Sequence, residues 1–365
     1  MQSAIRTLRI LTGLYLFVFT TCHLLTLSFG LVSLGAMETA HHTLMAPWRN
    51  ATGSITLGIA FLIHLVLGMV ALYHRNTLSM RTGDSVQFLS AYLVVPLLLP
   101  HVVVMANFER VFGVKPTFTV MLDYFWNLIP MDGFWQVVIV IVVWIHGCIG
   151  LLTWLRLRDN WPRWAPFVNP LVVAIPILAL LGFVEAGNQV IAMSRGTTRS
   201  LFTLTVYRDG VQFLVSLIQN LVTGYFVVLG LTLAARALRV YRVSQGDTVT
   251  LQFDTGETVN SRPGLNLLEI ANEHGIPHPN QCRGRGRCGT CRVRLDGNAP
   301  LPPASRIETD TLDQVSPGHA ARGERLACQL ALPSGRFTVH TLLLADLSER
   351  DLPERDVAST PEVSA

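Results

Sequence analysis

Six long stretches without Asp, Glu, Lys or Arg constrain this chain more than any other feature of its sequence. They are residues 10–37, 50–74, 85–108, 133–155, 164–184 and 210–235. Each is close to the roughly 20 residues that a membrane-spanning helix needs. The first is too long for a cleaved signal peptide and no small-residue cleavage site follows it. Because only 14% of the residues are charged, a wholly soluble globule is a poor fit. The sequence predicts six membrane spans.

The charged residues divide the chain and suggest its orientation. Residues 1–243 hold 16 Lys and Arg against 8 Asp and Glu, whereas residues 244–365 hold 12 against 16. With the N-terminus inside, ten basic residues flank the inner ends of the spans and six the outer ends. This bias favours a cytoplasmic N-terminus, and the even number of spans then places everything after residue 235 in the cytoplasm. We expect a transmembrane domain over 1–243, a second domain over 244–345 and a disordered polar tail over 346–365.

Each of the first four spans contains one histidine: His23, His64, His101 and His146. An ionisable side chain inside a bilayer indicates function by default, although a neutral histidine bonded to a neighbouring helix is the alternative. At about 1.5 Å per residue, His23 and His101 lie roughly 20 and 24 Å from the inner edge, and His64 and His146 both roughly 15 Å. Two pairs at two depths suit two bis-histidine haems and fit a zinc site poorly.

The four histidines and their helices resemble the di-haem b membrane anchor of the succinate dehydrogenase/fumarate reductase family, over about residues 5–240. The resemblance implies that the first and third histidines share one haem b, that the second and fourth share the other, and that the haems exchange electrons with quinone. The sixth span is a departure from that family. Glu185, in the fifth span, is a candidate proton acceptor of a quinone site, with solvation at the membrane interface as the alternative.

Four of the six cysteines lie in the C-terminal third of the chain. Cys282, Cys288 and Cys291 have the spacing C-x5-C-x2-C, and Cys328 follows after 36 intervening residues. In a cytoplasmic domain such cysteines favour metal ligation over disulfides. One loop of three cysteines with a distant fourth is the layout of a [2Fe–2S] ferredoxin. Zinc is the alternative, but it would more often show two C-x2-C knuckles.

The surroundings of these cysteines predict a small mixed domain. Alternation and turn signals indicate strands near residues 248–253, 257–261, 291–295 and 337–342, and a short helix over 266–274. The stretch Pro263 to Glu269, the five-residue first cysteine gap and the Leu-Ala-Cys-Gln sequence at 326–329 resemble adrenodoxin-type ferredoxins of the β-grasp fold. The resemblance implies that all four cysteines ligate the cluster. The expected fold is therefore an all-α six-helix transmembrane bundle followed by a small α+β domain.

Arginines around the cysteines depart from the acidic faces of many ferredoxins. They are Arg283, Arg285, Arg287, Arg292 and Arg294. Positive charge should raise the potential of the cluster, and it suits anionic lipid headgroups or an acidic partner. The alternative is general arginine usage, because 27 of the 28 basic residues are arginines.

The whole arrangement resembles the N-terminal part of certain bacterial class III adenylate cyclases, in which such an anchor acts as a redox sensor. We expect no cyclase, hydrolase or nucleotide-binding domain here, and no binding to nucleic acid. The favoured function is electron transfer between the quinone pool and a cytoplasmic acceptor at the bacterial inner membrane, as a component of a quinol-linked oxidoreductase. A redox sensor that reports to a separate effector protein, and an anchor that docks a dehydrogenase, are the alternatives.

Overall fold

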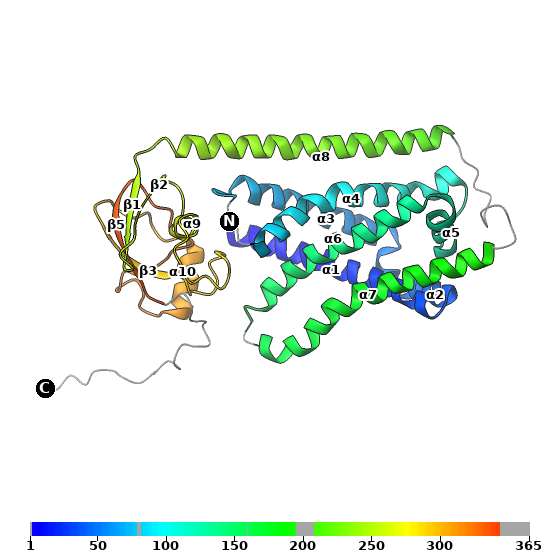
Figure 1. The fold of residues 1–365 in the computed structure, drawn as a ribbon, viewed down its shortest axis with the longest axis horizontal. Helices are drawn as coiled ribbons and strands as arrows, with labels where there is room; N and C mark the ends of the chain where they lie inside the picture. The colour runs from blue at the N-terminus through cyan, green and yellow to red at the C-terminus, as the bar shows by residue number, and fades with distance from the viewer. Residues whose placement is uncertain (1, 79–81, 159, 195–207, 344–365) are drawn as a thin grey trace. The chain divides into compact units, whose positions relative to one another are not determined.

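The structure, a computed structural model, describes residues 2–78, 82–158, 160–194 and 208–343 (Figure 1). It divides into two compact units, Met1–His74 with Met80–Ala234, and Arg75–Ser79 with Ala235–Ala365. The tail expected over 346–365 lies outside the described residues.

Six helices of the described chain are long and apolar enough to cross a membrane. They are α1 (Gln2–Ser28), α3 (Ala51–Tyr73), α4 (Thr82–Phe112), α6 (Pro130–Leu155), α7 (Trp161–Ser194) and α8 (Arg208–Val243). Shorter elements connect them: η1 (Phe29–Leu31), α2 (Leu34–Leu44), η2 (Ala46–Trp48), α5 (Phe118–Asp123) and the π-helical turn η3 (Tyr124–Leu128). The six predicted spans are confirmed as apolar helices, whereas these connecting elements were not predicted.

The first helix ends earlier than its apolar stretch. Residues 10–37 were expected to form one span, but α1 ends at Ser28. Ser33 is extended and its hydroxyl accepts the N–H of Ala36 at 3.0 Å, which starts the new helix α2. Between them, a Cβ on Gly30 would lie 2.3 Å from the carbonyl oxygen of Gly182. Only glycine therefore permits this close approach to α7.

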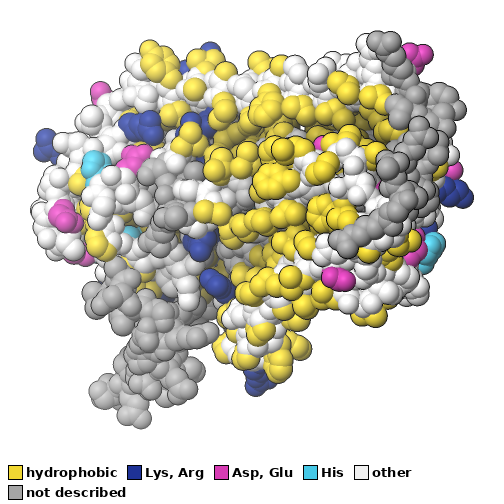
Figure 2. All heavy atoms as spheres, turned by 45° about the vertical axis from the view of Figure 1, so that its right-hand side comes forward, with side chains coloured by type: hydrophobic (Ala, Val, Ile, Leu, Met, Phe, Trp, Pro, Cys, Tyr) yellow, Lys and Arg dark blue, Asp and Glu magenta, His cyan; other side chains and the backbone are white. Residues whose placement is uncertain are grey.

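Large apolar side chains cover the outside of the helices as well as their core. Phe108 and Ala186 are fully buried in the first unit, yet Phe167 and Leu231 are 67% and 66% exposed. Figure 2 shows hydrophobic side chains spread along the helical surface. An apolar exterior of this extent is what a lipid bilayer, rather than water, stabilises.

The second unit is a five-stranded sheet with two helices. Its elements are β1 (Val249–Phe253), β2 (Thr258–Ser261), α9 (Leu267–Glu273), β3 (Arg292–Gly297), α10 (Arg306–Val315), β4 (Arg325–Leu326) and β5 (Gly335–Thr341). The strand order is β2-β1-β5-β3-β4, with β1 and β5 parallel and the other neighbours antiparallel. The predicted α+β fold is confirmed, but α10 and β4 were missed.

The core of this unit is made where α9 meets one face of the sheet. Leu251, Leu267, Ile270 and Val339 are all fully buried in it. A reciprocal capping box starts α9: the Asn266 side chain accepts the N–H of Glu269, and the Glu269 carboxylate accepts the N–H of Asn266. This cap fixes where α9 begins, and the cysteine loop follows the other end of the helix.

Candidate metal centres

The four predicted cysteine ligands converge in the second unit. Cys282, Cys288 and Cys291 lie on the loop between α9 and β3, and Cys328 lies two residues after β4. Their exposed fractions are 1%, 5%, 2% and 5% in that order, and all are free of disulfides. Buried thiols gathered from two distant segments are a donor set suited to soft metal ions.

The sulfur atoms form two pairs. The Sγ atoms of Cys291 and Cys328 are 3.3 Å apart. Cys282 donates its backbone N–H to Cys288 Sγ at 3.3 Å, and their thiols share a hydrogen bond. Among the described residues, no group of three or more His, Cys, Asp or Glu side chains surrounds one point closely enough for a single metal ion. Two pairs of thiols suit a cluster of two irons with four thiolates.

The loop reaches this shape through left-handed backbone conformations. Gly284, Gly286 and Gly289 have φ values of 78°, 60° and 67°, and Arg283 has 56°. A Cβ on Gly289 would also lie 2.4 Å from Val315 Cγ2. Because a side chain is strained in this region, the glycines allow the chain to wrap tightly and aim its N–H groups at sulfur.

Hydrogen bonds bias the protonation of the Cys282–Cys288 pair. The Cys288 thiol donates to Cys282, which lowers the pKa of Cys282 despite its burial, and backbone N–H groups of the loop add to the effect. The same hydrogen bond and burial raise the pKa of Cys288. The Thr290 hydroxyl lies 3.0 Å from Cys288 Sγ. These contacts favour the thiolate form of Cys282, which is the form that ligates metals.

A buried ion pair that was not predicted anchors the segment of Cys328. Glu308, in α10, has no exposed surface. It accepts two hydrogen bonds from Arg325, at 2.9 and 3.1 Å, and a third from the N–H of Leu326 at 2.8 Å. No local sequence signal marks Glu308, because its partners lie 17 and 18 residues further along the chain.

The structure brings the four membrane histidines together as two pairs in the first unit. The ring centres of His23 and His101 are 6.4 Å apart, and those of His64 and His146 are also 6.4 Å apart. These are the pairs that helix depth indicates. Each separation leaves room for one metal ion between the two rings. The residues present would therefore suit a haem iron held by two imidazoles.

The pairs connect helices that are not immediate neighbours. α1 packs on α3 and α4 packs on α6, whereas the histidine pairs run from α1 to α4 and from α3 to α6. The imidazoles thus face each other between two packed helix pairs. Among the described residues, the buried Nδ1 atom of His101 has no hydrogen-bond partner.

Neighbouring side chains orient the second pair. The Thr12 hydroxyl lies 3.2 Å from His64 Nδ1, and a Cβ on Gly13 would lie 2.8 Å from the His64 ring. His146 Nδ1 lies 3.3 Å from the carbonyl of Gln87 and 3.4 Å from the Ser90 hydroxyl. Contacts at Nδ1 leave Nε2 of each ring for a metal, the arrangement usual for ligating histidines.

Glu185, the candidate proton acceptor, is exposed on α7. Gln189 donates to its carboxylate at 3.4 Å and accepts the N–H of Leu34 at 3.1 Å. These contacts join α7 to the start of α2. A role for Glu185 in a quinone site stays a prediction.

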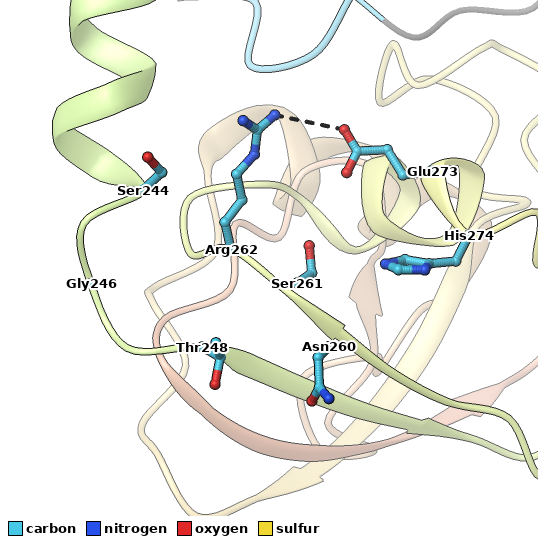
Figure 3. A pocket seen from close by; sticks show the side chains of 8 residues that line it. All are labelled: Ser244, Gly246, Thr248, Asn260, Ser261, Arg262, Glu273 and His274. Carbon is cyan, nitrogen blue, oxygen red and sulfur yellow. Dashed lines mark ion pairs between the residues drawn. The ribbon is translucent and has the colours of Figure 1, made fainter.

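A shallow polar pocket lies elsewhere in the second unit, where the chain passes from α8 into β1 (Figure 3). Arg262 and Glu273 point toward each other there, with a nitrogen–oxygen distance of 3.7 Å. The pocket contains none of the predicted metal ligands.

Comparisons with known proteins match part of this chain. Residues 251–332 match the family described as 2Fe-2S iron-sulfur cluster binding domain. The F subunit of the Na(+)-translocating NADH-quinone reductase of Yersinia enterocolitica is 30% identical over 118 residues, 32% of this chain and 28% of that protein. Its counterpart in Yersinia pestis is 32% identical over 116 residues, 31% of this chain and 27% of its own length. The chain therefore spans less than a third of these relatives.

Two solved ferredoxins also resemble part of the chain. The ISC-like [2Fe-2S] ferredoxin FdxB of Pseudomonas putida is 29% identical with a TM-score of 0.22, covering 26% of this chain and 90% of that one. The ferredoxin of Rhodopseudomonas palustris is 26% identical with a TM-score of 0.20, covering 25% and 93%.

The family match spans the segment that holds the four buried cysteines, and six apolar helices precede it. The chain therefore combines a [2Fe–2S] ferredoxin-type domain with helices suited to a membrane, which supports membrane-associated electron transfer.

Proposed function

We propose that this protein transfers electrons between a membrane quinone and a redox partner, through two b haems and one [2Fe–2S] cluster. The observation that carries the proposal is the equal 6.4 Å separation of the two imidazole pairs. One such pair is compatible with ordinary helix packing. Two pairs with the same spacing, in a chain that also carries a ferredoxin domain, favour two redox cofactors.

In this proposal the histidines hold and orient the haems. His23 and His101 would bind one iron, and His64 and His146 the other. The Thr12 hydroxyl and the Gln87 carbonyl lie at the Nδ1 atoms of the second pair, so they would keep Nε2 directed at the metal. When bound, each haem supplies one-electron chemistry.

The ferredoxin domain would hold the cluster in a dry, sulfur-rich site. Cys282, Cys288, Cys291 and Cys328 are its proposed ligands, and none is more than 5% exposed. Burial excludes water, and the loop N–H groups stabilise negative charge on sulfur. Similarity to the F subunits of an NADH-quinone reductase supports quinone as the redox partner only indirectly. Less than a third of the length of those subunits aligns with this chain.

The basic residues favour an orientation with the N-terminus and the ferredoxin domain in the cytoplasm of a bacterial inner membrane. Counted along the helices, His64 and His146 are then the pair nearer the cytoplasmic side. Quinone would meet the pair nearer the outside, and a cytoplasmic redox or effector protein would meet the cluster.

An optical and EPR titration of the full-length, detergent-purified protein tests the proposal. We expect two haem b per chain and a [2Fe–2S] signal that appears after the haems are reduced by added quinol. Haem reduction without cluster reduction would contradict the path between them. If the purified protein holds the cluster but no haem, the haem proposal is wrong and the protein is a membrane-attached ferredoxin.

The sensor alternative gives a different result in the same preparation. A transfer protein should pass many electrons per chain from quinol to a soluble acceptor. A sensor should bind an effector in one redox state and show no sustained turnover.

A further inference from the structure

Helix α8 carries exposed polar side chains that the rest of its unit does not cover. Five of them are amides or hydroxyls, and we call these residues the polar face of α8: Gln212, Ser216, Gln219, Asn220 and Thr223. In the part of the chain that the structure describes, none of the three side-chain amides has a hydrogen-bond partner.

The polar face points away from the helices on which α8 packs. Leu214 and Tyr225 are buried side chains of α8, at 4% and 7% exposure, and both belong to hydrophobic clusters of the first unit. At about 100° per residue, all five residues of the polar face lie within about 60° of the direction opposite Leu214. The polar face is therefore the side of α8 that is left for the surroundings of the protein.

Lipid cannot satisfy these amides. Residues 210–235 contain no Asp, Glu, Lys or Arg, and α8 is long and apolar enough to cross a membrane. Gln219 and Asn220 lie about 14–15 Å past residue 210 at about 1.5 Å per residue, near the middle of a hydrocarbon layer about 30 Å thick. Hydrocarbon offers no hydrogen bond, so amides at this depth favour pairing with another helix.

The spacing of the polar face suits a pair of parallel helices. Gln212, Ser216, Gln219 and Thr223 follow one another at intervals of four, three and four residues, the heptad alternation of a seam between parallel helices. Gly230 continues the seam seven residues after Thr223, and no atom lies within 4 Å of a Cβ placed on it. Space for a second helix is therefore present along this line.

We propose that the polar face of α8 pairs with the same face of a second copy of this chain, so that the protein is a parallel dimer in the membrane. Copies inserted in the same orientation have parallel α8 helices, as a two-fold axis along the membrane normal requires. Each amide and hydroxyl carries both a donor and an acceptor, so the face is complementary to itself. It holds no charged side chain, so no like charges meet across the axis. This inference is independent of the proposed haems.

The test measures association of the full-length protein in liposomes of phosphatidylcholine. Copies with a donor or an acceptor dye, attached enzymatically at the C-terminus so that the cysteines stay unmodified, are reconstituted together. Energy transfer is followed over a series of lipid-to-protein ratios and compared with that of randomly placed monomers at the same density. We expect the wild type to show a saturable transition from dimer to monomer on dilution.

Two variants address different properties of the interface. Q219L/N220L removes the amides and suits lipid better than the wild type, yet it should raise the dissociation constant about tenfold. Gly230→Leu should fold, because its side chain meets open space within one chain and leucine favours a helix over glycine. It should nevertheless abolish the dimer by holding the two helices apart.

Gly224→Leu is the matched control, on the same helix and also with no atom within 4 Å of its Cβ. Gly224 lies about 120° round the helix from Gly230, so this variant should dimerise as the wild type does. A monomeric wild type would overturn the proposal and leave a different membrane protein as the occupant of the polar face. Equal effects of the two glycine variants, or a dimer that survives both Q219L/N220L and Gly230→Leu, would also overturn it.

Discussion

Trp144 of α6 donates its indole N–H to the backbone carbonyl of Val172 in α7, at 2.7 Å. Four residues after Val172 comes Pro176, which has no N–H to give that carbonyl its helical hydrogen bond. Tyr225 of α8 makes the same kind of contact. Its hydroxyl donates at 2.9 Å to the backbone carbonyl of Tyr92, which lies four residues before Pro96 in α4. Side chains of neighbouring helices thus replace the donors that the prolines remove. In a bilayer this matters more than in water, because no solvent reaches the carbonyl.

Trp144→Phe should destabilise the transmembrane unit by about 1–3 kcal/mol, because it leaves the carbonyl of Val172 without a donor. In the Pro176→Ala background the cost should be smaller, since the substituted alanine restores the helical N–H. Thermal unfolding of the four proteins of this double-mutant cycle measures the coupling. Trp164→Phe is the control, at a side chain that is 60% exposed. Equal costs of Trp144→Phe in both backgrounds would show that the hydrogen bond is not what Trp144 contributes.

Structural features that depend on neighbouring residues in the sequence could be predicted from it. The apolar spans, the cysteine loop and strands such as β1 are signalled by length, spacing or alternation over a few residues. Helix depth also indicated which histidines lie together, because a regular rise per residue converts sequence separation into height. The ligand roles of those histidines and cysteines stay predictions.

Features that depend on distant partners could not be predicted. Helix α10 is short and polar, and Glu308 is one of its buried residues because Arg325 reaches it from β4. The end of α1 at Ser28 depends on the contact between Gly30 and α7. Residue type alone also made Glu185 a candidate, whereas its hydrogen bond to Gln189 is known only from the structure.

His101→Ala should remove one haem and leave the other haem and the cluster in place. His101 and His23 form one pair, and the second pair lies on different helices. Pyridine haemochromogen assays should give about one haem per chain instead of two, with an unchanged cluster EPR signal. The control is His42→Ala, whose side chain is 60% exposed. If both haems survive His101→Ala, the pairing is wrong.

Glu308→Ala should destabilise the ferredoxin domain by about 3–5 kcal/mol, because it leaves the Arg325 charge buried without a partner. The side chains of this pair are 0% and 14% exposed. Asp310→Ala, on the same helix, breaks only the exposed pair with Arg306 and should cost under about 0.5 kcal/mol. Urea unfolding followed by cluster absorbance compares them. Similar midpoints for the two variants would argue against an anchoring role for Glu308.

Acid should weaken the ferredoxin domain in part through Glu324. Burial opposes its ionisation, but hydrogen bonds from Arg322 and Ser316 and the charges of Arg322 and Arg292 outweigh burial and lower its pKa. The folded pKa then lies below the unfolded one, so this stabilisation is complete above the unfolded value near 4.5 and is lost as pH falls through the folded value. Glu324→Gln should be less stable at pH 7 and lose less on acidification. Thermal midpoints between about pH 6 and pH 3 measure this, and parallel curves for the two proteins would contradict it.

Thr290→Val should lower the reduction potential of the cluster. The Thr290 oxygen accepts the N–H of Gln281 at 3.1 Å, so its own hydrogen is available to Cys288 Sγ, 3.0 Å away. A donor to sulfur stabilises the reduced, more negative cluster. Removing it should shift the potential by on the order of 40 mV, equivalent to about 1 kcal/mol for one electron. Thr290→Ser keeps the hydroxyl and should keep the potential, which separates the hydrogen bond from side-chain packing. An EPR-monitored redox titration of the three proteins measures the shift. A serine variant whose potential falls as far as that of the valine variant would show that the hydroxyl group alone does not set the potential.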